Sequence, residues 1–357
     1  MNNFSNYTTH ANINGNKVPL LTWQTHYTSY GNLCTFEAKT SIKALKQIGY
    51  NIFDDQVQTP DLECQIILNN RTSGSSGLVF DGIVDTVEGN WEEDLVEIAG
   101  RDFSAILRDT NDTLDKYLNQ TVTQVIQAIA QQYGLQTNIA TVDQKTGIRS
   151  STYQGEDWAF SAHPQPTWQL MQDLATEADM VLFIDSHKVL NLQSPGKGSN
   201  HSFIWRPNQQ QGTNPVKDLS ILQQSRRCQN FTLMLHGYDA SAKQTISYQK
   251  VVGQGGQIIH KHRQDLNSQN CQQIADALAA EIQRKNLVVK FKVDGDLGIN
   301  LNDTVAINEG ESGDLLGLAA QSLFIVSVMH SFGDAEYGSI EGDGFWTHIT
   351  CNQKISS

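Results

Sequence analysis

The stretch that decides the fold of this chain is Leu95–Thr110, LVEIAGRDFSAILRDT. Its first half has the apolar content of a strand, and Gly100 predicts a turn after it, with a positive φ or a close backbone approach. We expect Asp102 to be the N-cap of a helix, because its carboxylate can accept the backbone N–H near Ala105. The apolar residues that follow share one helical face: Phe103, Ile106 and Leu107. The sequence predicts a strand, a glycine corner and a short helix, although an ordinary strand-to-helix connection has the same pattern.

Arg101 lies at this corner, and its side chain has two possible partners. It pairs with a carboxylate such as Asp109, or it points to a neighbouring subunit. Gly100, Arg101, Asp102 and Asp109 together are the predicted structural corner.

Residues 11–100 have the pattern of short strands separated by turns, which is typical of a barrel or sandwich. Asn14-Gly15 is a hairpin signal, Arg71–Gly77 (RTSGSSG) is a loop by composition, and Ser41–Ile48 favours a short helix. The expected strands are Val18–Trp23, Leu62–Leu68, Leu78–Phe80 and Ile83–Val87.

The middle of the chain changes to helical period. Val122–Tyr133 repeats apolar residues at the spacing of an amphipathic helix and Gly134 ends it, while a second helix follows Pro166 with Thr167 as the expected cap. Strands are expected after them at Leu135–Ile139, Met180–Ile184 and Val189–Leu192. Beyond Pro215 the sequence predicts a helix at Asn270–Arg284 and strands at Leu219–Leu222, Phe231–Gly237, a pair within Ala240–Val252, Leu287–Val293, Val305–Ile307, Leu323–Val328 and Trp346–Cys351.

The order of these segments resembles the late control gene D family of phage baseplate proteins, which includes the Mu-like hubs of contractile tails. The Gly-Arg-Asp corner and its helix, Gly100–Asp109, resemble the most recognisable segment of that family. Other similar segments are residues 78–100 (LVFDGIVDTVEGNWEEDLVEIAG), 121–135 (TVTQVIQAIAQQYGL), 167–195, 297–308 (LGINLNDTVAIN) and 323–332 (LFIVSVMHSF). The resemblance covers roughly residues 10 to 352, and it rests on the order of the motifs.

The resemblance implies an α+β, mainly β chain with two tube-like small β-barrels and helical or α+β insertions between them. The implied domains are residues 1–110, a first barrel with the corner, 111–214, a middle domain, and 215–357, a second barrel with an inserted helix. Three copies would form a ring. The implied partners are a tail tube protein, a separate central spike protein and other baseplate proteins, with no cofactor.

Composition limits the function classes. The 357 residues suggest two to three domains. A net charge of −13 argues against a general nucleic-acid binder, so DNA could pass through a lumen without specific binding. Five scattered cysteines favour free thiols and assembly in a bacterial cytoplasm. The polar start, MNNFSNYTTH, argues against a signal peptide, and no apolar run approaches the roughly 20 residues that cross a membrane.

Candidate catalytic and metal sites are incomplete in the sequence. His260 and His262 form an H-x-H pair but lack further ligands at standard spacing, which favours a solvated loop. A triad of His163 or His187 with Asp185 and a serine, Ser161 or Ser186, lacks a nucleophile elbow. Ser194–Asn200 (SPGKGSN) lacks the full phosphate-loop pattern.

Charged clusters complete this search. The acidic run Glu92, Glu93 and Asp94 is typical of a solvated face, and Arg226-Arg227 is a small basic spot.

Two functions remain: a structural hub that joins a six-fold tail tube to a three-fold spike, and, as the alternative, a tail-associated cell-wall hydrolase. Since nearly every stretch maps onto the hub pattern, we favour the structural, non-enzymatic function in a virion baseplate or injection particle.

Overall fold

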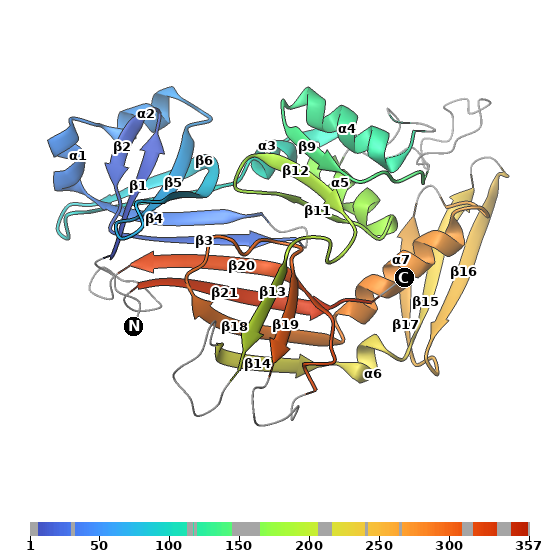
Figure 1. Cartoon of the computed structure of the whole chain (residues 1–357). Coiled ribbons are helices and arrows are strands. Elements are labelled where there is room, and N and C mark those ends of the chain that lie inside the picture. Colours follow the sequence, from blue (N-terminus) through green and yellow to red (C-terminus); the bar gives the residue numbers. More distant parts are fainter. Residues whose placement is uncertain are drawn as a thin grey trace.

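The computed structural model describes residues 6–29, 33–112, 117, 120–144, 165–205, 216–239, 242–263, 266–308, 317–333 and 344–355. The chain is mainly β, with helices packed against parts of its sheets (Figure 1). The helices are α1 (Ile42–Ile48), α2 (Ile52–Gln58), α3 (Ser104–Asp109), α4 (Val122–Gln132), α5 (Thr167–Glu177), α6 (Ser225–Cys228) and α7 (Cys271–Arg284). None of them is long and apolar enough to span a membrane, within the part of the chain that is described.

Thirteen strands form one large sheet. They are β1 (Tyr7–Ile13), β2 (Asn16–Pro19), β3 (Thr22–Thr28), β4 (Thr35–Ser41), β5 (Glu63–Asn70), β6 (Ser76–Asn90), β7 (Leu95–Arg101), β13 (Asn200–Ile204), β14 (Lys217–Gln223), β18 (Leu287–Asp294), β19 (Thr304–Asn308), β20 (Leu323–Gly333) and β21 (Gly344–Gln353). The smaller sheets contain β8 (Asn111–Asp112) with β10 (Gln165–Pro166), then β9 (Gln136–Ile139), β11 (Val181–Ile184) and β12 (Val189–Gln193), and finally β15 (Phe231–Asp239), β16 (Gln244–Val252) and β17 (Gln257–Arg263).

The large sheet joins the two ends of the chain. Its order is β14-β18-β21-β20-β3-β4-β7-β6-β5-β1-β2, with β13 and β19 attached beside β20. The junction is the antiparallel pairing of β3 with β20, where Tyr27 lies opposite Val328. Strands β14 and β2 end this order and do not pair with each other, so the described strands form an open sheet and not closed barrels.

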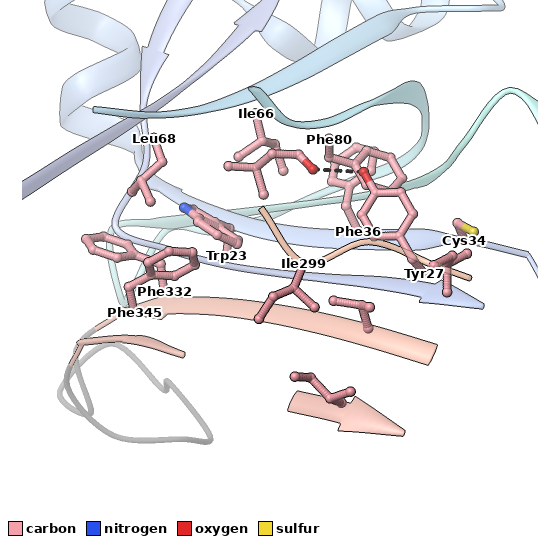
Figure 2. Packing of buried hydrophobic residues seen from close by; sticks show 14 of the residues in the cluster. Trp23, Tyr27, Cys34, Phe36, Ile66, Leu68, Phe80, Ile299, Phe332 and Phe345 are labelled. Atoms are coloured by element: carbon pink, nitrogen blue, oxygen red, sulfur yellow. Dashed lines mark hydrogen bonds between the residues drawn. The ribbon is translucent and has the colours of Figure 1, made fainter. Parts of the chain in front are cut away.

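A single apolar core lies on one face of this sheet. Figure 2 shows its aromatic centre, in which Tyr27, Phe36 and Phe80 come from β3, β4 and β6. The ring centroids of Phe80 lie 5.3 Å from Tyr27 and 5.1 Å from Phe36, and the Tyr27 hydroxyl donates to the Val79 carbonyl at 2.8 Å. Burial of each large side chain contributes about 1.5–3 kcal/mol, so this core holds the N-terminal and C-terminal strands together.

The middle of the chain has its own core, built from α3, α4, α5 and the small sheet of β9, β11 and β12. The periodicity predicted α4 correctly. Thr121 caps it in a capping box with Gln124, and Gly134 ends it at φ 66°. The cap predicted for α5 is wrong: Pro166 occupies the N-cap position, and Thr167 begins the helix with its hydroxyl 3.2 Å from the Thr110 carbonyl.

A third unit consists of β15, β16, β17 and α7, which projects from the side of the large sheet (Figure 1). The helix predicted at Asn270–Arg284 is confirmed as α7. It packs on one face of the three-stranded sheet through Phe231, Leu233, Leu235 and residues such as Ile274 and Leu278. The opposite face of that sheet is open to solvent.

Other local predictions divide into confirmed and wrong. Asn14 and Gly15 adopt φ 48° and 79° in the predicted hairpin, and the helix predicted at Ser41–Ile48 is confirmed as α1, with Ser41 at its N-cap. The two short strands predicted around Asp81-Gly82 are one continuous strand, β6, because β5 pairs with it across that dipeptide and β7 pairs with it from Ile83 onward. Within the described part of Ala240–Val252 there is one strand, β16, whose partner is β15.

Candidate functional site

Gly100 lies inside β7 and not at a turn, because the strand continues through Arg101. It pairs with Phe36 of β4 on one side and with Val84 of β6 on the other. A Cβ atom at this position would lie 2.0 Å from the Ile83 carbonyl oxygen and 2.6 Å from the Phe36 ring. The expected close approach is therefore present, whereas the expected turn is absent and Gly100 has no positive φ.

Arg101 binds two carboxylates at the end of β7. Its Nε and Nη2 atoms donate to Asp85 at 2.6 and 2.8 Å, and its Nη1 and Nη2 atoms donate to Asp109 at 3.3 and 3.0 Å. These hydrogen bonds, with Asp85 first, raise the pKa of Arg101. Asp85 reaches Arg101 because the register of β6 shifts between Val84 and Thr86. Sequence reasoning proposed Asp109 and missed Asp85, which lies on the neighbouring strand.

Asp102 is buried and does not cap the helix as predicted. Phe103 occupies the N-cap position of α3, without a side-chain cap. The Asp102 carboxylate accepts from the Ser104 hydroxyl at 2.5 Å, while its backbone carbonyl accepts from the Ala105 N–H. Burial raises the pKa of Asp102 to about 6. The corner is thus a buried carboxylate beside an exposed ion-pair cluster.

The second face of the large sheet carries mostly polar side chains, of which most are at least partly exposed. We define the polar sheet face by one row of cross-strand neighbours: Lys292, His348, Met329, His26, Thr35 and Arg101. This row crosses β18, β21, β20, β3, β4 and β7, so it joins both ends of the chain and ends at the Arg101 corner. A parallel row contains Asp294, Trp346, Ser331, Gln24, Glu37 and Ala99.

Two ion pairs lie on the polar sheet face. Lys39 and Glu97 are 2.6 Å apart, and Lys217 and Asp294 are 2.9 Å apart. A groove of about 290 Å³ over β3, β4, β6 and β7 is lined by one ammonium group and three carboxylates, which belong to Lys39, Glu37, Glu88 and Glu97. A surface of this kind offers few free cations to a phosphate backbone.

Among the described residues, Asp185, Ser186 and His187 do not form the proposed triad. The Asp185 carboxylate accepts from the backbone N–H groups of His187 and Val189 at 2.9 and 3.1 Å, so it organises the turn between β11 and β12 and does not orient the imidazole. Ser186 Oγ lies 3.3 Å from His187 Nδ1. His163 and Ser161 lie outside the described residues.

The turn at Ser194–Asn200 is held by protein groups instead of a phosphate. The Gly196 N–H donates to the Asn302 side chain and the Ser199 N–H donates to the Asp303 carboxylate, both at 2.7 Å. Asp303 is only 3% exposed and also contacts His201 at 2.9 Å. The backbone donors that a phosphate loop would need are therefore occupied.

The remaining candidates from the sequence are the acidic run, the arginine pair and the H-x-H pair. Glu92 and Glu93 are exposed in the turn before β7, where Asp94 accepts from the Ser41 hydroxyl at 2.8 Å. Arg226 and Arg227 lie in α6, and the Arg226 side chain is outside the described part. His260 and His262 lie on the strand β17, so the predicted solvated loop is wrong. In the described part of the chain, no group of three His, Cys, Asp or Glu side chains is positioned to hold a metal ion as it stands.

This mainly β fold, with a separate core in the middle of the chain and a projecting helix-sheet unit, is similar to the folds of two solved tail proteins. No family model matches the sequence, and no curated protein matches it. The chain is similar to the tail protein from Neisseria meningitidis MC58, with 11% identity, TM-score 0.66 and coverage of 97% of this chain and 96% of that one. It is also similar to the 43 kDa tail protein of prophage MuSo2 from Shewanella oneidensis, with 16% identity, TM-score 0.64 and coverage of 97% and 98%.

A third similar structure is the E. coli c3393 protein, described as a component of the type VI secretion system with structural similarity to the T4 bacteriophage tail proteins gp27 and gp5. It has 11% identity and TM-score 0.55, over 97% of this chain and 77% of that one. The comparisons therefore bear out the broad phage-tail resemblance at the level of fold.

Proposed function

We propose that this chain is the central hub of a contractile-tail baseplate, in a phage, a tailocin or a related injection system. The observation that carries the proposal is the agreement of fold along nearly the whole length of a tail protein and of a prophage tail protein. Its place would be the virion baseplate or the injection particle, and its role would be structural.

The geometry that supports a ring is the division of the large sheet into two halves. Residues 1–110 supply β1 to β7, and residues 215–357 supply β14 and β18 to β21, with the middle domain of residues 111–214 between them. If each half acts as one tube-like unit, three subunits present six such units to a six-fold tail tube. The same homotrimer keeps three-fold symmetry for a separate spike protein and for other baseplate proteins.

The open edges of the sheet also favour assembly. Edge β14 carries Ile221 and Leu222, which are 37% and 52% exposed. An exposed apolar edge strand invites pairing with another chain, and a closed ring covers every such edge. In this proposal the polar sheet face is the wall of the lumen. Its paired charges fit passage of DNA without specific binding.

The ring is the first testable prediction. Light scattering of the purified protein with its tail components should give three copies of this chain, and an electron-microscopy map should show a tube protein above them and a spike protein below. Leu222→Asp should prevent ring formation by charging the β14 edge. Val57→Asp on α2, where the side chain is 86% exposed, is the matched control and should assemble normally. A ring with six copies, or a monomer in the particle, would contradict the proposal.

The second prediction concerns the hydrolase alternative. The protein should hydrolyse neither peptidoglycan nor nucleotides, since the Asp185 carboxylate and the donors of the Ser194–Asn200 turn are occupied by structural hydrogen bonds. Zymography on cell walls and a phosphate-release assay measure this. A lytic band that disappears when one carboxylate is replaced by its amide would establish the enzymatic alternative.

A further inference from the structure

The open face of the projecting three-stranded sheet carries a cluster of three histidines. His236 lies on β15, and His260 and His262 lie on β17. The two strands are parallel neighbours, with Met234 beside His260 and His236 beside His262. Because side chains alternate along a strand, all three imidazoles stand on the same face, opposite the face that packs on α7.

The rings are already in contact. The ring centroid of His236 is 5.3 Å from that of His260 and 5.3 Å from that of His262. His236 Nε2 lies 3.0 Å from His260 Nδ1, which is hydrogen-bond distance between two ring nitrogens. Two nitrogen ligands of a tetrahedral ion at 2.0–2.1 Å are about 3.3 Å apart, which differs little from this separation.

A neighbouring strand orients the central imidazole. Ser247 on β16 lies opposite His236, with its Oγ 3.1 Å from His236 Nδ1. A hydroxyl at one ring nitrogen fixes the ring and leaves the other nitrogen for a ligand, as the outer partners of metal-binding histidines do. The basic residues Lys261 and Arg263 alternate to the other face of β17, where Arg263 pairs with Glu177 at 2.7 Å. Their charges therefore point away from the cluster.

We propose that His236, His260 and His262 form a surface site for a divalent transition-metal ion that prefers imidazole, with zinc or nickel as the probe. The ion would lie beside the line that joins His236 Nε2 and His260 Nδ1, and the His260 and His262 rings would turn about their side-chain torsions to direct a nitrogen at it. His260 and His262 are exposed, so this rotation meets little resistance from packing. A bound ion would tie β17 to β15, and this inference is independent of the proposed function.

Calorimetric titration of the full chain with zinc chloride, and separately with nickel chloride, tests the site at pH 7.5. We expect one ion per chain. His236→Gln, His260→Gln and His262→Gln should each weaken the affinity about tenfold or more, and Ser247→Ala should weaken it less. His187→Gln is the control, because His187 is an exposed histidine in the turn between β11 and β12, away from the cluster. The five cysteines are buried and will not compete as ligands.

A second measurement separates binding from unfolding. Zinc should raise the melting midpoint of the wild-type protein and of His187→Gln, but not that of the triple variant His236→Gln/His260→Gln/His262→Gln. Lowering the pH should weaken binding, since protons compete with the metal for imidazole. Zinc binding of equal affinity in the folded triple variant, or no binding in the wild type, would overturn the proposal.

Discussion

Gly100→Ala is expected to lower the free energy of unfolding by about 3 kcal/mol or more, at the upper end of what overpacking costs. The added methyl group would lie 2.0 Å from the Ile83 carbonyl oxygen of β6 and 2.6 Å from the buried Phe36 ring of β4. Neither neighbour can rotate away, because one is backbone within a paired strand and the other is packed in the core. Denaturant unfolding monitored by circular dichroism measures the loss.

Two further glycine variants make this test specific. A Cβ atom at Gly82, on β6, would lie 2.2 Å from the Arg101 carbonyl oxygen, so Gly82→Ala should be damaging for the same reason. Gly298→Ala is the control: Gly298 is exposed, and its nearest contact is the flexible Asp296 carboxylate at 3.1 Å. Equal stability of Gly100→Ala and Gly298→Ala would show that β6 and β7 do not approach so closely.

The unfolding free energy of Asp102→Asn, relative to that of the wild type, should increase as the pH rises. Burial raises the pKa of Asp102 from 3.8 to about 6 in the folded protein, so the folded state holds the proton more tightly than the unfolded state. The wild type therefore loses stability as the pH rises from about 4 to about 6, and the full effect is about 3 kcal/mol. Because asparagine cannot ionise, the variant does not lose stability in this way as the pH rises.

The measurement is the difference in unfolding free energy between Asp102→Asn and the wild type at pH 4.5 and pH 7.5. This difference should shift by about 2 kcal/mol in favour of the variant at the higher pH. His330 acts in the opposite direction. Burial lowers its pKa from 6.5 to about 4, so stability is lost as the pH falls from about 6.5 to about 4. Comparing both proteins at the same pH removes the His330 contribution. Asp61→Asn, at an exposed carboxylate, is the control, and an equal shift there would refute the assignment to Asp102.

The sequence by itself determined the elements whose signals are local. The apolar spacing of α4 and α7, the Asn14-Gly15 hairpin and the short helix at Ser41–Ile48 all depend on residues within one or two turns of each other. The order of such segments was also enough to indicate the phage-tail fold. Short-range periodicity carries this information because each element must bury one face of its own.

Only the tertiary structure decided how distant strands meet. Three features depend on the register between strands: the pairing of β3 with β20, the continuity of β6 and the contact of Arg101 with Asp85. Register between distant strands does not produce a pattern at a fixed spacing in the sequence. The burial of Asp102 follows from the same packing. The position of His236 beside His260 and His262 also follows from tertiary structure. The parallel pairing of β15 with β17 brings together residues that are more than 20 positions apart in the sequence.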